Sequence, residues 1–435
     1  MRYAIPVAIG RAVRVAARIR KPGGGSAIPG VVVNRIAPGY LRATLDGFPG
    51  GLAIVTGSSG KSTTTKMLVE ILRAHGADLF TNPSTANIAQ GLTSAVIEQA
   101  DWKGEVAGEI GVLEMDEGHG AVVTRGLSPK AVVLTNVMVD QIDRFHDPEM
   151  VAEMLRKIAS RATGAVAYNA DDALLLTLVA GLDASVERLP FGASRELVEA
   201  APHGLGLAQT AAERLPDGTG VRLVALDGRR ATLEVEGAPL ELTMPARGLH
   251  YGMDAAGAIA GALAILGRDR FDLATAKAAF ERLEPVFGRG EQTVVRGKTV
   301  EFVLVQNPAS LQLNIDGLDE GLEQVLFAVG SDVRDESYLW STDLARLGRV
   351  QIVTGSKAHD AALHLAYDDV EIERVEPDLH RALDDFLAQP EPSRGVKTII
   401  FTADAMRRTR LHLGLAGGDK DAAPKVGAAQ KGDAS

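Results

Sequence analysis

The sequence predicts an α/β protein built on a doubly wound, mostly parallel sheet, with a smaller α/β domain at its C-terminal end. Short apolar runs alternate with helical patterns along much of the 435 residues, which is the pattern of parallel strands joined by helices. Polar residues follow directly after several of these runs, at the sheet edge where such folds bind ligands. One run also leads through a glycine-rich loop into a helix. The length allows two or three domains.

Each predicted strand of the larger domain is a short apolar run bounded by turn residues. Parallel strands are expected at Leu52–Val55, Ala77–Phe80, Ile110–Leu113, Ala131–Leu134 and Ala165–Tyr168. Alternating residues and an Asp-Gly turn then predict an antiparallel meander, with strands at Val221–Leu226, Ala231–Val235 and Leu240–Met244. Between these groups, Asp147-Pro148 predicts a helix start, because it places a capping residue before proline at the first position. The alanine-rich Gly252–Gly267 predicts a buried helix.

Shifts in composition divide the chain into domains. The expected divisions are 1–45 for an N-terminal basic helix and lead-in segment, 46–295 for a central domain with a β-rich insert at about 191–244, 296–416 for the C-terminal domain, and 417–435 for a tail. The tail contains polar and small residues that cannot bury a core, and we expect it to be disordered.

Charge and cysteine content exclude several classes of function. The formal net charge of -10 argues against nonspecific nucleic-acid binding, which needs a basic surface. The chain has no cysteine, which excludes disulfides, thiolate zinc sites and a cysteine nucleophile within it. No apolar run reaches the ~20 residues of a membrane span. These features are compatible with a cytoplasmic protein.

The first 21 residues carry arginines and a lysine but no acid, with aliphatic residues interspersed. Arginines interrupt the apolar run, whereas a signal peptide has a continuous apolar core and a cleavage site of small residues. Two interpretations stay open. The segment is either an interfacial helix near anionic lipid or a basic amphipathic helix packed on the domain.

The glycine-rich loop after Leu52–Val55 predicts a phosphate site. Its N–H groups, the following helix N-terminus and the charge of Lys61 all favour an anion. Ser62 would place a hydroxyl on Mg²⁺. The residues predicted to hold ATP here are Gly57, Ser58, Ser59, Gly60, Lys61, Ser62 and Thr63. Lys61 is also the predicted catalytic cation, because it would neutralise charge on the transferring phosphate.

Acidic residues follow two of the predicted strands. Glu114 and Glu117 come just after Ile110–Leu113, and a carboxylate there could hold the Mg²⁺ that bridges ATP phosphates; we favour Glu114. Asp143 and Arg144 follow the next strand. Their local pattern is equally consistent with a ribose and phosphate contact and with a surface charge run.

These motifs resemble the Mur ligases, and more closely the MurT-type ligase subunits of lipid II isoglutaminyl synthases. The short glycine loop G-x-x-G-K-[ST] followed by threonines is typical of Mur ligases and folylpolyglutamate synthases. The resemblance covers about residues 25–413. Its most specific stretches are TGSSGKSTTT, LTNVMVDQIDRF, YNADD, FGRGE, QNPAS and SDVRDESYLW. By this resemblance Asp254 and Arg289 also belong to the ATP site.

The chain departs from the family pattern in several places. The family usually carries a four-cysteine zinc ribbon in the central domain, so we expect no zinc in this chain. Tyr251 and Asp254 stand where the family has asparagines that help to hold adenine. Gln306 replaces the lysine of the KNPAG motif, and Val333 replaces a glycine in the C-terminal DGxDxSW motif.

The resemblance implies ATP-dependent amidation of the α-carboxylate of D-glutamate in the lipid II stem peptide, with Mg²⁺ and an acyl phosphate. A separate GatD-like glutamine amidotransferase subunit would supply ammonia from glutamine. Asp335, preferred over Asp332, would reach across to orient the histidine of that partner. A protein of this kind would be cytoplasmic, at the inner face of the plasma membrane where lipid II lies.

Two other functions stay open. The first is a stand-alone amide ligase that joins an amino acid, as other Mur or polyglutamate ligases do. The second is a nucleotide-binding protein that has lost catalysis, which the altered adenine-site residues favour and the intact Lys61, Ser62 and Glu114 oppose.

Overall fold

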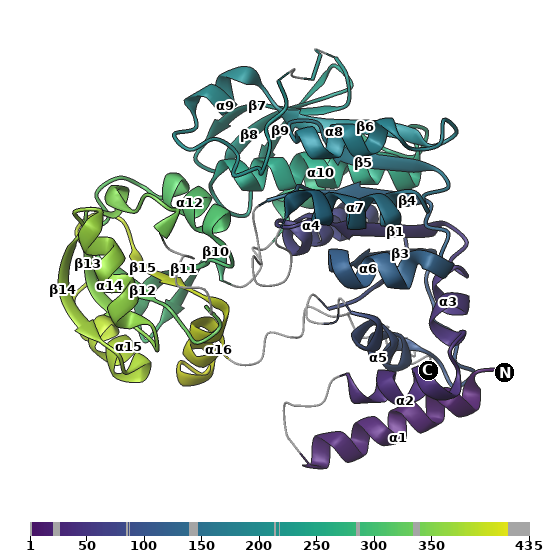
Figure 1. Ribbon diagram of the computed structural model, residues 1–435, viewed down its shortest axis with the longest axis horizontal. Coiled ribbons are helices and arrows are strands. Elements are labelled where there is room, and N and C mark those ends of the chain that lie inside the picture. The colour runs from purple at the N-terminus through teal and green to yellow at the C-terminus, as the bar shows by residue number, and fades with distance from the viewer. Residues whose placement is uncertain are drawn as a thin grey trace, which may run out of the picture.

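The computed structural model describes residues 2–20, 27–83, 86, 88–138, 147–212, 215–216, 218–283, 288–333 and 340–415. Within these residues the chain forms two sheets, each covered by helices (Figure 1). The larger sheet and its helices occupy the N-terminal two thirds of the chain, and the smaller sheet follows. The predicted fold class, a doubly wound α/β domain followed by a smaller α/β domain, is confirmed.

The larger sheet contains nine strands in the order β2-β3-β1-β4-β5-β6-β7-β8-β9. From β2 to β7 neighbouring strands are parallel, and β8 and β9 are antiparallel. The predicted meander therefore extends the main sheet. The strand bounds are β1 Gly51–Thr56, β2 Leu79–Thr81, β3 Ile110–Glu114, β4 Ala131–Leu134, β5 Ala165–Asn169, β6 Glu187–Ala193, β7 Val221–Asp227, β8 Arg230–Val235 and β9 Ala238–Thr243.

Helices cover both faces of this sheet, because successive strand residues point to opposite sides. In β1, Ala53 and Val55 pack toward α4 (Lys61–Ala74), α10 (Leu249–Leu266) and α11 (Leu273–Glu281). Leu52 and Ile54 pack into the opposite core. The helices of that side are α1 Ala4–Arg20, α2 Ile28–Ile36, α3 Tyr40–Leu45, α5 Ala89–Gln99, α6 Glu117–Val123, α7 Pro148–Ala159 and α8 Ala173–Ala180; α9 Arg195–Ala200 lies beside β7.

One helix of the described residues, α10, is long and apolar enough to cross a membrane. Of its 18 residues, 89% are buried inside the protein, where the helix packs against α4 and strands β4 to β7. This burial shows that α10 is a core helix, as its composition predicts. Its small alanine and glycine side chains let α4 and the strands approach it closely.

The smaller sheet contains six strands in the order β10-β11-β15-β12-β13-β14. Only the pairing of β10 with β11 is antiparallel. The elements are β10 Arg289–Val295, β11 Lys298–Leu304, α12 Pro308–Gly317, β12 Val325–Ala328, β13 Arg349–Thr354, α14 Ala358–Tyr367, β14 Glu371–Glu376, α15 Leu379–Ala388, β15 Lys397–Phe401 and α16 Ala403–His412. β10 therefore belongs to the second sheet, although the expected boundary at 296 assigned it to the central domain. The expected tail, 417–435, lies outside the described residues.

Candidate active site

The glycine-rich loop joins β1 to α4, as predicted, and its backbone admits only glycine at two positions. Gly57 has φ +137° and Gly60 has φ +79°, in the region that side chains disfavour. A Cβ on Gly57 would lie 2.2 Å from Thr135 Oγ1, and one on Gly60 would lie 2.2 Å from Asp254 Oδ1. The loop is therefore fitted closely between the end of β4 and the first turns of α10.

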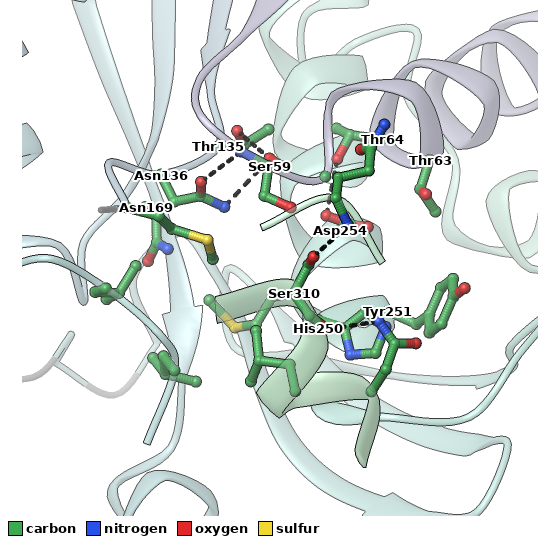
Figure 2. A pocket seen from close by; sticks show the side chains of 18 of the residues that line it. Ser59, Thr63, Thr64, Thr135, Asn136, Asn169, His250, Tyr251, Asp254 and Ser310 are labelled. Atoms are coloured by element: carbon green, nitrogen blue, oxygen red, sulfur yellow. Dashed lines mark hydrogen bonds between the residues drawn. The ribbon is translucent and has the colours of Figure 1, made fainter. Parts of the chain in front are cut away.

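Two residues at the end of β4 fasten this loop. Asn136 Oδ1 accepts from the Ser59 N–H at 2.9 Å, and Asn136 Nδ2 donates to the Ser59 carbonyl at 3.2 Å. The Thr135 hydroxyl donates to the same carbonyl at 2.7 Å (Figure 2). Sequence reasoning did not assign these roles. The signal was their position, directly after the strand that pairs with β1.

Lys61 is the first residue of α4, and its ammonium faces back over the loop. Lys61 Nζ donates to the carbonyls of Gly57 at 2.5 Å and Ser58 at 3.1 Å. It also forms an ion pair with Glu117 Oε2 at 3.2 Å, and the Glu117 side chain is only 3% exposed. The lysine is thus held over the glycine-rich loop by two carbonyls and one buried carboxylate.

The predicted Mg²⁺ carboxylate, Glu114, is the last residue of β3 and is paired in register with Val55 of β1. Its backbone is clamped on both sides by Asn82, which accepts from its N–H and donates to its carbonyl, each at 3.0 Å. Glu114 and Glu117 are both buried. The carboxylate that contacts Lys61 directly is that of Glu117, which lies three residues beyond the preferred Glu114.

Among the described residues, no group of three or more histidine, aspartate or glutamate side chains could by itself hold a metal ion. Mg²⁺ is usually bound through one or two carboxylates together with substrate phosphates and water, so this finding does not test a Mg²⁺ site. Ser62, in the first turn of α4, and Glu114, at the adjacent strand end, remain the predicted ligands of such a site.

A cleft opens beside the loop, with about 820 Å³ of empty space including its mouth. Residues from both domains line it: Ser59, Gly60, Thr63 and Thr64 of the loop and α4; Thr135, Asn136, Met138, Asn169 and Phe191 of the sheet edge; Leu205, Leu207, His250, Tyr251, Met253 and Asp254; and Leu304, Gln306, Ser310, Leu313 and Asn314 of the C-terminal domain. Such a cleft, at the carboxyl ends of parallel strands and between two domains, is where ligands usually bind.

Asp254 and Tyr251, the residues at the family's asparagine positions, occupy different parts of this cleft. The Thr64 hydroxyl of α4 donates to Asp254 Oδ1 at 3.2 Å, and the same oxygen lies close to Gly60, so this carboxylate lies against the glycine-rich loop (Figure 2). The Tyr251 ring instead packs on His250, with 4.3 Å between ring centroids. The two substitutions therefore affect separate parts of the cleft.

The two aspartates of the YNADD stretch have structural contacts. Asp172 caps α8 by accepting from Leu174 and Leu175, and its other oxygen accepts from the Val137 N–H at 2.6 Å. Its burial raises the pKa of Asp172 to about 6. Asp171 Oδ2 accepts from the Ala193 N–H at 2.8 Å. The bond from Val137 fixes the segment after β4 that carries Asn136, and the bond from Ala193 fixes the end of β6.

Several predicted residues lie outside what the structure describes. Asp335, Asp143 and Arg144 are among them, and the side chain of Arg289 is as well, although its backbone begins β10. Asp332 is described: its Oδ1 accepts from the Thr402 hydroxyl at 2.8 Å within the C-terminal domain.

Comparison with known proteins identifies two successive domains. Residues 55–260 match the Mur ligase middle domain, and residues 304–406 match the MurT ligase C-terminal domain. The MurT subunit of the lipid II isoglutaminyl synthase (glutamine-hydrolyzing) of Staphylococcus aureus strain COL is 26% identical over 394 residues, covering 82% of this chain and 86% of that protein. The corresponding subunit of Streptococcus pneumoniae is 27% identical, covering 76% and 78%.

The fold is also found in solved structures. MurF from Acinetobacter baumannii superposes with a TM-score of 0.66 at 17% identity, covering 87% of this chain and 80% of that one. The glycine-rich loop lies in the matched Mur ligase middle domain, and the cleft beside it is lined by residues of both matched domains. The chain therefore carries a Mur ligase middle domain followed by a MurT ligase C-terminal domain, the domain pair of ATP-dependent ligases of the MurT type, and is similar along most of its length to MurT subunits.

Proposed function

We propose that this chain is the ligase subunit of a lipid II isoglutaminyl synthase, which converts D-glutamate of the stem peptide to D-isoglutamine. The observation that carries the proposal is the combination of a Mur ligase middle domain with a MurT-type C-terminal domain in one chain, matched along most of its length by MurT subunits. A stand-alone amide ligase has less support, because a UDP-N-acetylmuramate–L-alanine ligase of Bifidobacterium longum matches over only 59% of this chain.

The proposed reaction has two steps. An oxygen of the α-carboxylate attacks the γ-phosphorus of ATP, the bond to the ADP oxygen breaks, and an acyl phosphate forms. Ammonia then attacks the acyl carbon, loses a proton and displaces inorganic phosphate, leaving the amide. The loop N–H groups and Lys61 stabilise the charge that develops on the transferring phosphoryl group. Mg²⁺, held through Ser62 and Glu114, would neutralise further phosphate charge.

The interdomain cleft supports this assignment, because it brings the phosphate loop close to α12 of the C-terminal domain. Ser310 and Gln306 line the cleft opposite Ser59 and Gly60. Asn307 caps α12, and Ser310 completes the capping box, so the backbone at this wall of the cleft is fixed. A carboxylate activated at the loop would then be open to ammonia arriving from the C-terminal domain.

The proposal includes a partner and a location. A GatD-like glutaminase would release ammonia, since this chain has no cysteine nucleophile. The complex would act in the cytoplasm, on the lipid II exposed at the inner face of the plasma membrane. We expect the chain to need ATP and Mg²⁺ but no zinc, because structural zinc sites of this kind depend on thiolates.

The direct test supplies the full chain with lipid II, ATP, Mg²⁺ and ammonium chloride, and analyses the stem peptide by mass spectrometry. We expect amidation of one carboxylate, and with a co-expressed glutaminase we expect glutamine to replace ammonium. Addition of an amino acid in place of ammonia would identify a stand-alone ligase. Nucleotide binding without turnover would identify a protein that has lost catalysis, a function consistent with the Asp254 carboxylate beside Gly60.

Glu114 and Glu117 form a matched pair for testing the Mg²⁺ assignment. Both are buried glutamates, three residues apart, so glutamine at each removes a charge with little change in shape. We expect Glu114→Gln to raise the Mg²⁺ concentration that gives half-maximal ATP turnover about tenfold, because a charged ligand is lost. Glu117→Gln should change that concentration less. The reverse order would transfer the metal role to Glu117.

A further inference from the structure

The N-terminal helix α1 has two apolar faces, and the residues that the structure describes cover only one of them. Its inner face packs through buried Val7 and through Gly10, where a Cβ would lie 2.8 Å from Val33 and 3.0 Å from Ile97. Tyr3 packs on Tyr40, with 5.0 Å between ring centroids. Helix α1 is therefore fixed to α2 and α5, along the lower border of the molecule in Figure 1.

The outer face of α1 is an exposed stripe that contains only aliphatic residues. At 3.6 residues per turn its members fall within one third of the helix circumference, opposite Val7 and Gly10. We call this the α1 stripe; it comprises Ile5, Ala8, Ile9, Ala12, Val15, Ala16 and Ile19. Ile5 is 75% exposed and Ile19 is 79% exposed. A continuous apolar stripe on a packed helix indicates a surface that meets another apolar phase.

The segment that carries the stripe is basic in sequence. Arg2 lies just before α1, and Arg11 and Arg14 lie within it. Arg11 donates to the carbonyl of Ile97 at 3.3 Å and to that of Ala100, and Arg14 pairs with Glu98 at 2.5 Å, so these two also hold α1 on α5. The first 45 residues contain eight arginines and lysines and no acid, in a chain of net charge -10.

An exposed tryptophan adjoins the same end of the molecule. Gly104 packs on the backbone of Tyr3, where its Cβ would lie 3.1 Å away, so the loop carrying Trp102 lies beside the start of α1. Trp102 is 67% exposed, and Lys103 Nζ lies 5.3 Å from its ring centroid. Tryptophan next to lysine is a combination suited to the membrane–water interface.

We propose that the α1 stripe and Trp102 dock the protein on an anionic phospholipid bilayer. The aliphatic side chains enter the boundary between headgroups and acyl chains, while the net positive charge of this acid-free segment attracts anionic lipid headgroups. A second copy of this chain is disfavoured as a cover for the α1 stripe in a symmetric dimer. Two basic segments without acidic residues would then face each other, and their like charges would repel. The inference goes beyond the proposed reaction and needs no substrate for its test.

The test is sedimentation of the full chain with vesicles of phosphatidylcholine alone and of phosphatidylcholine mixed with phosphatidylglycerol. We expect binding to the anionic vesicles, weakened by salt, and little binding to the neutral ones. Ile5→Gln/Ile19→Gln should weaken binding about tenfold, since two exposed aliphatic side chains no longer enter the lipid. Leu363→Gln/Leu411→Gln is the matched control, because both leucines are exposed on helices of the C-terminal domain; it should bind like wild type.

A second measurement uses the fluorescence of Trp102, which lies near the start of α1. The chain has two tryptophans, so Trp340→Phe leaves Trp102 as the sole indole, whose emission should shift to the blue on anionic vesicles. Wild type that stays in the supernatant with anionic vesicles would overturn the proposal, as would equal binding by the Ile5/Ile19 variant. A dimer in solution that this variant dissociates, without vesicle binding, would assign the stripe to a second copy. ATP turnover in solution by the same variant is expected to be unchanged, which separates this outcome from failure of the proposed function.

Discussion

Replacing Lys61 with alanine should lower ATP-dependent amidation about a thousandfold. The Lys61 ammonium is the one positive charge that the described loop and its first helical turn place over the phosphate site, and it is held there by the carbonyls of Gly57 and Ser58. Charge on the transferring phosphoryl group would lose this partner in a site partly screened from water, where one preorganised donor is worth about 10²–10³ in rate. The measurement is the steady-state rate of ADP release with lipid II and ammonium.

Two further variants separate charge from structure. Lys61→Met keeps the aliphatic stem, so it should lose as much activity as Lys61→Ala if the charge is responsible. Lys157→Ala removes a lysine that is paired with Glu153 on the surface of α7, and it should leave the rate unchanged. Near-wild-type amidation by either Lys61 variant would refute the phosphate-site assignment. Unfolding curves would show whether removal of Glu117's partner also lowers stability, since that carboxylate is buried.

Much of the central fold could be predicted because local signals specify it. Strand β4 begins and ends where its apolar run does, at Ala131 and Leu134. Helix α7 begins at Pro148, with Asp147 accepting from the Glu149 N–H as a capping residue should. The hairpin between β7 and β8 turns at Gly228, with φ +55°, as an Asp-Gly sequence predicts. Each of these features depends on residues close in sequence.

Features decided by distant contacts could not be predicted in the same way. Residues 28–36 contain three consecutive valines, which favour a strand, yet they form α2 because Val33 and Gly30 pack against α1 and α5. The pairing of β10 with β11, rather than with the central sheet, is likewise decided by tertiary packing and not by local sequence.

The site shows the same division. The loop glycines and Lys61 lie where the motif predicts, since the motif is itself a local strand–loop–helix unit. The contact of Asp254 with Thr64 joins residues 190 positions apart, and no local pattern specifies it. The choice between Glu114 and Glu117 depends on side-chain direction at the junction of β3 and α6. The sequence locates that junction but does not orient its carboxylates.

Replacing Asp335 with asparagine should abolish glutamine-driven amidation while sparing amidation from ammonium. If Asp335 orients a histidine of the glutaminase partner, an amide there would leave the imidazole in the wrong tautomer, a change that costs about 10⁴ in turnover in a comparable triad. The phosphate loop belongs to the other domain, so activation of the carboxylate should continue. The assay compares both nitrogen sources with the complex of the two subunits.

Asp332→Asn is the matched control for this prediction, because it changes an aspartate three residues away in the same motif. Asp332 already accepts from the Thr402 hydroxyl within its own domain, and asparagine Oδ1 can accept the same bond. We therefore expect Asp332→Asn to keep glutamine-driven activity. Loss in this variant alone would transfer the partner role to Asp332. Equal loss of both activities in Asp335→Asn would instead mean that Asp335 supports the fold or the ligase site, because carboxylate activation would then have failed as well.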